Sequence, residues 1–475
     1  MIVIICDATK EIGYGHLKRC LVLASFYRQL SVSVTFLMRH DSKIIKDILS
    51  SEKMGLVVRS NHKKALSYLD KNKIQIKLVI IDHYEVGPDI EEEIFKMFPV
   101  LVIDDLCRPH WCNLLVDQTF KRDKCQYDKK LYYPLTRTLL GIEFTLIDPI
   151  YETVRSNGDQ SNILITFGAT DPENRALQLL EILENKMSKK DVVFHLPLSS
   201  LSPCLDEVKK FICQSKMDIR LYQDLSDLSL LYEKSGIAIG APGTSLLERI
   251  YCGLINITVV VAQNQEEVGQ KFSDQGMTLH FGGIHNLDFS KLIKTLEHLI
   301  DSQSYRKELQ KKTLGLVDGK GALRIIKKSI PLIDSIKLRS AKKNDLKVLC
   351  QWQQNKGARQ HFKNTAIPSK QEHQIWFGHV LSSKDIVLMI IEWNNKPIGY
   401  IRLNIQLKKN EISILIIPEF QGFGFAKAGL KKIVDDNSQD YIAFVKPENK
   451  ASIQLFKSVG FQHIGKGEYI LNAVS

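Results

Sequence analysis

Short apolar runs alternate with amphipathic segments along the first two thirds of the chain. Runs of this kind, with no polar residue on either face, are typical of parallel strands that helices cover on both sides. Segments with helical spacing, such as 17–30, separate them. This βαβ succession predicts a doubly wound sheet for residues 1–151. The expected strands lie within 2–6, 32–38, 77–82, 99–105 and 113–118.

The pattern stops in a polar stretch and then begins again. Residues 152–162 contain Gly and Ser, lack periodicity and are predicted to be a linker. A second βαβ series follows and predicts another doubly wound domain, 152–334. Its expected strands lie within 163–172, 192–198, 218–224, 237–243 and 257–265.

The last part of the chain has a different order of elements. Apolar runs at 387–395, 397–405 and 411–418 follow one another with short connections. Asn394-Asn395 is a candidate hairpin turn, because both residues tolerate the positive φ that such turns need. We expect an α+β domain at 335–475, so the fold class is α/β with two Rossmann-like domains and a third, α+β domain.

Composition narrows the class of protein. The chain has 475 residues, too many for one core, and its 44% hydrophobic and 25% charged residues are typical of globular proteins. The first apolar run is short and follows no basic region, and no run approaches a membrane span, so we expect a cytoplasmic protein without a membrane partner. The 9 cysteines are scattered without a Cys-x-x-Cys pair. Reduced thiols are therefore expected, with no metal site.

The net charge of +12 is compatible with several anionic partners. Nucleic acid, a membrane surface, nucleotides and coenzyme A all attract a basic protein. The lysines are dispersed, however, and no basic stripe is interleaved with stacking aromatic residues. A nucleic-acid partner is not expected, and charge alone does not choose among the others.

The loop after the first strand combines glycines with a histidine. Gly13 and Gly15 allow the backbone to approach a ligand closely, and His16 stands where the next helix begins. A neutral imidazole there can accept a proton as a general base. The alternative is that His16 only caps the helix. Asp82, like the pair Asp104-Asp105, ends an apolar run and either lines the same cleft or fixes its own loop.

The second domain carries candidate phosphate and sugar contacts at its strand ends. Gly168 ends one strand, and Asp171-Pro172 is expected to open the following helix. After the strand that ends at Gly240, the chain turns and a helix begins whose free N–H groups suit a diphosphate, and a carboxylate one turn further suits a ribose. Ordinary capping is the alternative. The candidates are Gly168, Gly243, Thr244, Ser245, Glu248, Asn264 and Gln265.

Residues 1–333 contain, in this order, the motifs IGYGHLKRC, IDHYE, VLVIDDL, LLVDQT, ITFGATDPEN, GAPGTSLLERIYCG, AQNQ and LVDGKGALRI. This series resembles the UDP-sugar hydrolases of pseudaminic acid biosynthesis, which are relatives of the GT-B glycosyltransferases. The resemblance implies that His16 activates water against the anomeric carbon, that UDP leaves, and that no metal is needed. It also implies that Gly13, Gly15, Arg19, Asp82, Tyr84 and Asn264 line the sugar and diphosphate site, and that Thr244, Ser245 and Glu248 hold UDP. The chain departs from the family at Gly168-Ala169, where two glycines are usual.

The third domain contains a glycine loop between a strand and a helix. Such a loop can hold a pyrophosphate, and it lacks the Lys-Ser/Thr of an ATP-binding P-loop. With the segment 445–461 it resembles the GNAT N-acetyltransferases across 336–475, which implies acetyl-CoA as cosubstrate. The family often has a tyrosine where Phe456 stands, and its usual proton donor is therefore missing. The residues assigned to acetyl-CoA are Gln421, Gly422, Gly424, Phe425, Ala426, Asn449, Ser452 and Phe456.

The acceptor side of this domain gives weaker signals. His373 and Trp376 resemble the GNAT branch that acetylates amino groups of UDP-amino sugars, although core packing is the more ordinary role for Trp376. His373, Glu411 and Tyr441 are the candidates for the group that takes the ammonium proton.

Together the two resemblances predict a bifunctional enzyme of pseudaminic acid biosynthesis. It would N-acetylate UDP-4-amino-4,6-dideoxy-N-acetyl-β-L-altrosamine with acetyl-CoA and then release UDP, giving 2,4-diacetamido-2,4,6-trideoxy-L-altrose. The alternatives are a GT-B glycosyltransferase that uses a UDP-amino sugar, an enzyme of a related, legionaminic-type pathway, and a nucleotide-sugar binding module without catalysis.

Overall fold

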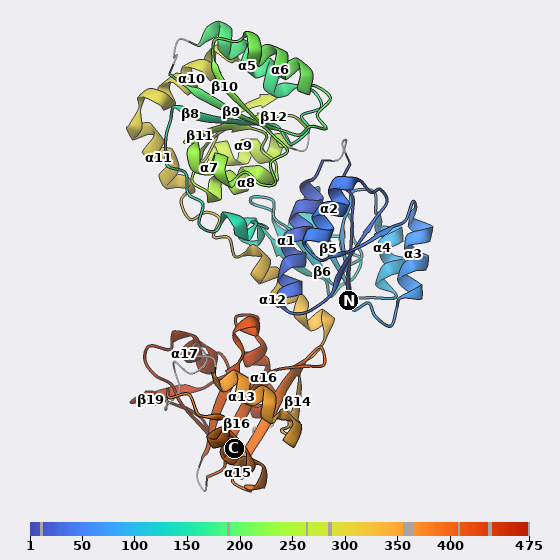
Figure 1. Ribbon diagram of the computed structural model, residues 1–475, viewed down its shortest axis with the longest axis vertical. Helices are drawn as coiled ribbons and strands as arrows, with labels where there is room; N and C mark the ends of the chain where they lie inside the picture. Colours follow the sequence, from blue (N-terminus) through green and yellow to red (C-terminus); the bar gives the residue numbers. More distant parts are fainter. Residues whose placement is uncertain are drawn as a thin grey trace. The chain divides into compact units, whose positions relative to one another are not determined.

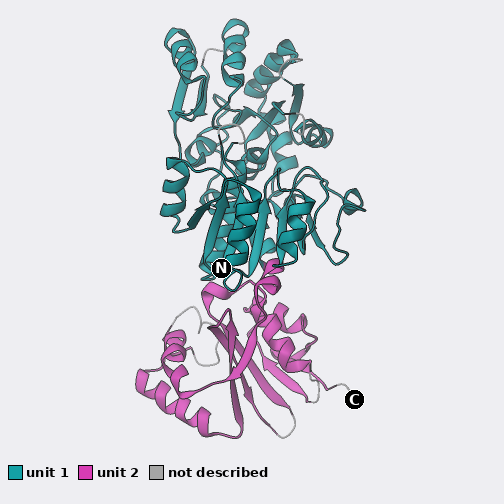
Figure 2. Ribbon diagram, turned by 90° about the vertical axis from the view of Figure 1, so that its right-hand side faces the viewer, with its two compact units in different colours: residues 1–326 teal, residues 327–475 magenta. Residues whose placement is uncertain are grey.

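The computed structural model describes most of the chain and divides it into two compact units, 1–326 and 327–475 (Figure 2). The predicted domain boundaries at 151/152 and 334/335 stay predictions. The described residues are 1–9, 13–187, 191–262, 265–283, 287–354, 365–406, 409–435 and 439–473.

The first unit begins with a seven-stranded parallel sheet (Figure 1). Its order is β3-β2-β1-β4-β5-β6-β7. Strands β2 and β3 are added on one side of β1 and strands β4 to β7 on the other, so the order of the strands reverses between β1 and β4. The five residues of β1 are all buried, as expected for an apolar strand between two neighbours. The elements are β1 (Ile2–Cys6), α1 (Gly15–Gln29), β2 (Val34–Met38), α2 (Lys43–Ser51), β3 (Gly55–Val58), α3 (His62–Lys71), β4 (Leu78–Asp82), α4 (Pro88–Phe95), β5 (Val100–Ile103), β6 (Leu114–Asp117), η1 (Lys124–Tyr127), β7 (Arg137–Leu140), η2 (Ile142–Phe144) and η3 (Pro149–Tyr151).

A second parallel sheet of six strands follows in the same unit. Its order, β10-β9-β8-β11-β12-β13, reverses between β8 and β11 and is that of a Rossmann fold. One apolar cluster joins both halves of the unit, with the rings of Phe120 and Phe272 stacked at 4.3 Å. The elements are β8 (Asn162–Thr166), α5 (Arg175–Lys186), β9 (Val193–Leu198), α6 (Leu205–Gln214), β10 (Asp218–Gln223), α7 (Ser229–Lys234), β11 (Ile237–Gly240), α8 (Thr244–Tyr251), β12 (Ile255–Val260), α9 (Glu266–Asp274), β13 (Leu279–Gly283), α10 (Phe289–Asp301) and α11 (Gln303–Thr313). Helix α12 (Gly321–Ile333) follows and crosses the boundary between the two units.

The second unit contains a mixed sheet of order β14-β15-β16-β17-β18-β20-β19. Asn394 and Asn395 have φ of 52° and 59° and form the expected hairpin turn between β15 and β16. The three sheets confirm the predicted fold class. The elements are β14 (Lys337–Ser340), η6 (Lys343–Asp345), α13 (Leu346–Gln354), α15 (Lys370–Ser382), β15 (Ile386–Trp393), β16 (Lys396–Asn404), β17 (Asn410–Ile416), η7 (Pro418–Phe420), α16 (Phe425–Val434), β18 (Tyr441–Phe444), α17 (Lys450–Lys457), β19 (Gln462–Gly465) and β20 (Glu468–Leu471).

The pairing of β17 with β18 positions the cavity of this unit. The two strands are parallel and pair through only two residue pairs, Asn410 with Tyr441 and Glu411 with Ile442. Beyond Glu411, β17 keeps its ladder with β16 on the other side. The remaining length of β17 is therefore open toward the helices α16 and α17, which follow it in the chain.

Among the helices in the described ranges, none is both long enough and apolar enough to cross a lipid bilayer.

Candidate active sites

The first candidate site lies where the first sheet reverses direction. In sheets of this kind, ligands bind beyond the carboxyl ends of the strands at such a point. The loop after β1 leads to Gly13, whose φ of +79° suits glycine, and α1 begins two residues later at Gly15. Asp82 is the last residue of β4, the strand beside β1. The topology therefore brings together the loop and the carboxylate that the sequence marked separately.

His16 is held by Asp82 at this point. Its side chain is buried, with the residue 8% exposed, and Nδ1 lies 2.7 Å from Asp82 Oδ1. An ionised carboxylate only accepts hydrogen bonds, so in a neutral ring this contact places the hydrogen on Nδ1 and the lone pair on Nε2. A nitrogen of Arg19 also lies 3.1 Å from Nδ1, but it donates to the same Asp82 oxygen. Tyr84, which is 40% exposed, meets the imidazole edge to face with ring centres 4.6 Å apart. A base fixed in one tautomer by a buried acid is the arrangement of a catalytic histidine.

Arg19 ties this pair to a second carboxylate. Its Nε donates to Asp82 Oδ2 at 2.6 Å, and another of its nitrogens donates to Asp105 Oδ2 at 2.9 Å. Asp105 also accepts from the Tyr84 hydroxyl at 2.9 Å. Arg108 closes the cluster, with its guanidinium 5.5 Å from the centre of the Tyr84 ring. Arg19, Asp82 and Tyr84 thus lie together, and their role in lining a sugar site stays a prediction. Arg108 was missed because nothing in its spacing sets it apart from other surface arginines.

The electrostatics keep Asp82 ionised. Burial alone opposes the charge, but the charge and hydrogen bonds of Arg19, with a contribution from His16, hold the pKa of the Asp82 carboxyl well below its ordinary value. The permanent negative charge of Asp82 can therefore stabilise an imidazolium at His16 across the physiological pH range.

The neighbouring His83 has a different role. Its Nδ1 accepts from the Glu85 backbone N–H at 3.0 Å, and its Nε2 donates to Asp7 at 3.0 Å. Both ring nitrogens are thus committed to hydrogen bonds. Burial opposes ionisation of Asp7, but His83 and Arg39 lower the pKa of its carboxyl to about 2. His83 therefore fixes the end of β1 and has no nitrogen left for proton transfer.

Asp104 is likewise structural, since it faces the buried His110. The imidazole is 1% exposed; Nδ1 donates to Glu91 Oε1 at 2.9 Å, and Nε2 lies 3.3 Å from Asp104 Oδ2. Burial opposes a positive charge, but the two carboxylates outweigh it and raise the pKa of His110 to about 9.

This histidine gives a prediction for stability against pH. The folded pKa of about 9 exceeds the ordinary histidine value, so the contribution is complete below pH ~6.5 and is lost as the pH rises through the folded pKa. We expect His110→Gln to remove about 3 kcal/mol of this pH dependence from the free energy of unfolding. The free energy of unfolding is measured by hydrogen exchange of peptides from α4 and β5 between pH ~6.5 and the folded pKa of about 9. His40→Gln, at an exposed histidine, is the control. Parallel pH curves for His110→Gln and the wild type would contradict the assignment.

The second sheet presents two glycine loops at its own point of reversal. Gly168 follows β8 and has φ of +107°. Gly240 ends β11, where an added Cβ would lie 2.2 Å from the Thr166 carbonyl oxygen. The fully buried Arg249 supports the loop that follows, because it donates to the Ala241 carbonyl at 3.0 Å. Arg249 is a second residue that the sequence did not reveal, since an arginine inside a helix is ordinarily at the surface.

Helix α8 begins at Thr244, as expected, and Gly243 is its N-cap. Thr244 and Ser245 are the first two residues of the helix and therefore not its N-cap, and Gly243 has no side chain with which to cap the first N–H groups. A Cβ on Gly243 would lie 3.7 Å from the Gln265 amide nitrogen, and one on Gly15 would lie 3.8 Å from the Thr244 hydroxyl. Gly15, beside His16, therefore lies close to Thr244 at the start of α8, and Gly243 lies close to Gln265.

Glu248 lies one turn into α8. It accepts from the Tyr232 hydroxyl at 2.9 Å. Burial raises the pKa of its carboxyl, and the charge of Lys18 from α1 partly opposes this. Asn264 lies outside the described residues.

The prediction that Asp171-Pro172 opens a helix is wrong. Helix α5 begins at Arg175, and the Asp171 carboxylate accepts from the backbone N–H groups of Arg175 and Ala176. Asp171 thus caps α5 from three residues before the N-cap residue, Asn174.

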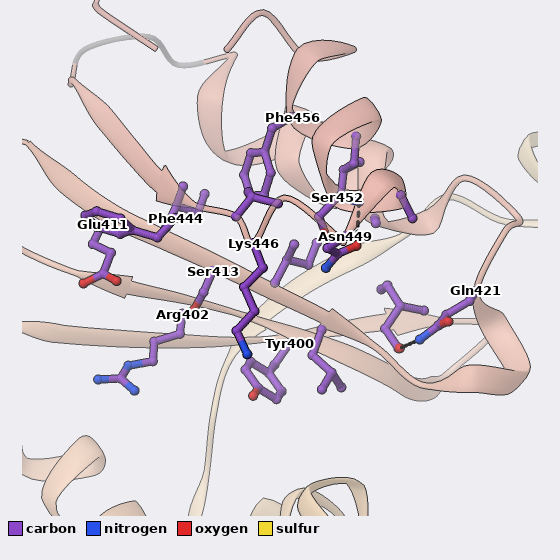
Figure 3. A pocket seen from close by; sticks show the side chains of 18 of the residues that line it. Tyr400, Arg402, Glu411, Ser413, Gln421, Phe444, Lys446, Asn449, Ser452 and Phe456 are labelled. Carbon is purple, nitrogen blue, oxygen red and sulfur yellow. Dashed lines mark hydrogen bonds between the residues drawn. The ribbon is translucent and has the colours of Figure 1, made fainter. Parts of the chain in front are cut away.

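The second unit contains a cavity of about 1550 Å³ (Figure 3). It lies along the open length of β17 and is bounded by α16 and α17. All eight residues that the sequence assigned to acetyl-CoA line it: Gln421, Gly422, Gly424, Phe425, Ala426, Asn449, Ser452 and Phe456.

The glycine loop has the geometry of an anion site. Gly422 and Gly424 have φ of +80° and +90°, and a Cβ on either would meet no atom within 4 Å. Gly424 is the N-cap of the ten-residue helix α16 and has no side chain with which to cap its first N–H groups. Gln421 anchors the loop by donating to the Ile416 carbonyl at 2.8 Å. Open space, exposed N–H groups and a helix N-terminus fit the pyrophosphate of coenzyme A.

The other side of the cavity comes from α17 and its cap. Asn449 accepts from the backbone N–H of Ser452 at 3.0 Å and so begins the helix. Phe456 is buried against Phe461, with ring centres 5.0 Å apart, and supplies an apolar wall without a proton donor. His373 and Glu411 also line the cavity, whereas Tyr441 is not among the lining residues that the structure describes.

In the described part of the chain, no three or more His, Cys, Asp or Glu side chains gather as metal ligands would.

Comparison with known proteins defines the class of the second unit. Residues 335–462 match the family model described as an acetyltransferase (GNAT) domain. The chain thus contains a GNAT domain, and the cavity with its glycine loop belongs to it. This match supports acetyl-CoA as the cosubstrate.

Three curated relatives extend the comparison to the first unit. An uncharacterized protein of Methanocaldococcus jannaschii is 27% identical and covers 98% of this chain and 97% of its own length. The UDP-2,4-diacetamido-2,4,6-trideoxy-beta-L-altropyranose hydrolase of Campylobacter jejuni is 24% identical, over 58% of this chain and 97% of the relative. The spore coat polysaccharide biosynthesis protein SpsG of Bacillus subtilis is 27% identical, over 40% of this chain and 57% of the relative.

Proposed function

We propose that the chain is a bifunctional nucleotide-sugar enzyme. The second unit N-acetylates the 4-amino group of a UDP-amino sugar with acetyl-CoA, and the first unit then hydrolyses the acetylated UDP-sugar. In its full form the proposal places both steps in pseudaminic acid biosynthesis, with 2,4-diacetamido-2,4,6-trideoxy-L-altrose as the released sugar.

The observation that carries the hydrolytic half is His16 held by a buried, ionised Asp82. In the proposed reaction Nε2 takes a proton from water while the water oxygen bonds to the anomeric carbon. The bond between that carbon and the UDP oxygen breaks, and UDP leaves with the electron pair. UDP is a good leaving group, so a positioned base and an anion site suffice.

The sugar nucleotide would be held by groups at the carboxyl ends of the strands, at the point in each sheet where the strand order reverses. The N–H groups at the start of α8 face the diphosphate, and Glu248 binds the ribose hydroxyls. Arg19 and Tyr84 border the sugar beside His16. The name of the Campylobacter relative supports this choice of substrate.

In the acetyltransferase half, the acceptor amine attacks the thioester carbonyl, a C–N bond forms, and coenzyme A leaves as the thiolate. The loop at Gly422 and Gly424 holds the pyrophosphate of acetyl-CoA. Because Phe456 carries no hydroxyl, we expect the thiolate to take its proton from solvent or from the amine.

Mass spectrometry of the products tests both halves. The full chain is incubated with a UDP-4-amino sugar and acetyl-CoA, and thiol release and UDP release are followed. We expect an N-acetyl product first and then free diacetamido sugar with UDP. A requirement for an added sugar acceptor before UDP appears would replace hydrolysis by glycosyl transfer, and binding without turnover would reduce the chain to a binding module.

A further inference from the structure

One end of the cavity in the second unit has its own set of charged side chains. Tyr400, Arg402 and Asn404 alternate along β16 and so share a face of the sheet, with Glu411 and Ser413 opposite them on β17. All five line the cavity. Figure 3 shows Arg402 and Glu411 at one end of the pocket and Gln421 of the glycine loop at the other. This end is therefore left for the acceptor when acetyl-CoA occupies the loop.

Asn404 links the two charges. Its side-chain oxygen accepts from Arg402 Nε at 2.9 Å, and its side-chain nitrogen donates to Glu411 Oε2 at 3.1 Å. The two bonds fix the orientation of the amide, since a flipped amide would place donor against donor and acceptor against acceptor. Arg402 and Glu411 are thus held side by side on neighbouring strands.

The guanidinium of Arg402 is available for an anion. It lies 5.9 Å from the centre of the Trp376 ring, and the hydrogen bond to Asn404 uses Nε, which is one of its three nitrogens. Lys446, which also lines the cavity, adds a second positive charge and points toward Tyr400 in Figure 3. A polycationic acceptor would meet repulsion here, whereas an anionic group would find charge-assisted donors.

We propose that this end of the cavity selects an acceptor that carries both an amine and a phosphate group. Glu411 faces the amine, Arg402 binds the phosphate, and Asn404 is a positioning residue for both. The inference rests on the proposed acetyl transfer to a UDP-amino sugar and adds to it the residues that recognise the amine and the phosphate.

Acceptor selection is tested by comparing acceptors with and without a phosphate group and by removing the charge of Arg402. Wild type, Arg402→Gln and the control Lys384→Gln, which removes an exposed charge of the same unit, are assayed for thiol release. The acceptors are a UDP-4-amino sugar, the same amino sugar without UDP, and spermidine. We expect the wild type to favour the UDP-linked amine, and Arg402→Gln to raise the KM for it about tenfold to thirtyfold, as loss of one charge-assisted bond implies. Arg402→Gln should not change the KM for the free amino sugar.

Calorimetry of coenzyme A binding accompanies each variant and shows that Arg402→Gln retains a folded cavity. Equal use of the three acceptors by the wild type, or an equal loss on both amino sugars in Arg402→Gln, overturns the selection while leaving acetyl transfer in place. Failure of the wild type to acetylate any of them overturns the proposed function and this inference with it. If Lys384→Gln raised the KM as much as Arg402→Gln does, the change would come from net charge, and the proposed role of Arg402 would also be overturned.

Discussion

His16→Ala is expected to stop UDP release, with kcat lower by about a thousandfold or more, while acetyl transfer continues at the wild-type rate. General bases contribute about 10²- to 10⁴-fold, and in the proposed reaction His16 is the group that activates water. The imidazole lies next to Asp82 in the first unit, far along the chain from the GNAT domain. Separate assays of UDP and of free thiol measure the two activities on the same sample.

Two further variants make this result specific. His40→Ala removes an exposed imidazole from the same unit and is expected to change neither activity. Asp82→Asn keeps the shape of the side chain but removes the charge that fixes the tautomer of His16, and we expect UDP release to fall about a hundredfold or more. It also leaves the guanidinium of Arg19 less well paired, so thermal unfolding must be compared in parallel. Wild-type UDP release by His16→Ala would exclude the proposed base.

The central strands of the first unit were predictable because burial on both faces demands continuous apolar runs. β1 and β4 belong to this class, and the residues that follow them are where the site lies. Strands β3 and β7 were missed. They are edge strands of four residues each, and their sequences, GLVV and RTLL, are too short to give a pattern.

The sequence predicted those residues of the candidate site that lie at the ends of strands or the starts of helices, and not which of them would contact each other. Gly13, His16 and Asp82 each stand at an element boundary, so the sequence marked them one by one. Which carboxylate would hold which imidazole was not readable, because strand order decides it. Asp82 meets His16 since β4 lies beside β1, whereas Asp104, which looks equivalent in sequence, faces His110 instead.

In the acetyltransferase cavity, too, contacts between residues far apart in the sequence were not predicted. Its predicted residues come from two short contiguous segments, the glycine loop at 421–426 and the start of α17 at 449–456, and all eight line the cavity. The acceptor end is built from alternating positions of two antiparallel strands. Arg402 and Glu411 become neighbours only through the register that places Asn404 opposite Glu411. That register depends on the geometry of the turn between β16 and β17 and on which face of the sheet is buried, and neither was assigned from the sequence.

Gly424→Val is expected to weaken acetyl-CoA binding about a hundredfold. The residue has φ of +90° at the N-cap of α16, where a β-branched side chain costs on the order of 1–3 kcal/mol. No neighbouring atom lies within 4 Å of an added Cβ, so the side chain itself would fit. It would, however, stand in the open space where the pyrophosphate must meet the first N–H groups of the helix. Calorimetric titration with acetyl-CoA measures the change.

The matched control separates loop geometry from a general effect of bulk. Gly378 lies on the exposed face of α15, has no positive φ and also has no atom within 4 Å of an added Cβ. Gly378→Val is therefore expected to bind acetyl-CoA as the wild type does. UDP release from an already acetylated UDP-sugar should be unchanged in both variants, because that step belongs to the first unit. If Gly424→Val bound acetyl-CoA as tightly as Gly378→Val, the start of α16 would not be the pyrophosphate site, and the cavity would have to hold coenzyme A by its other wall.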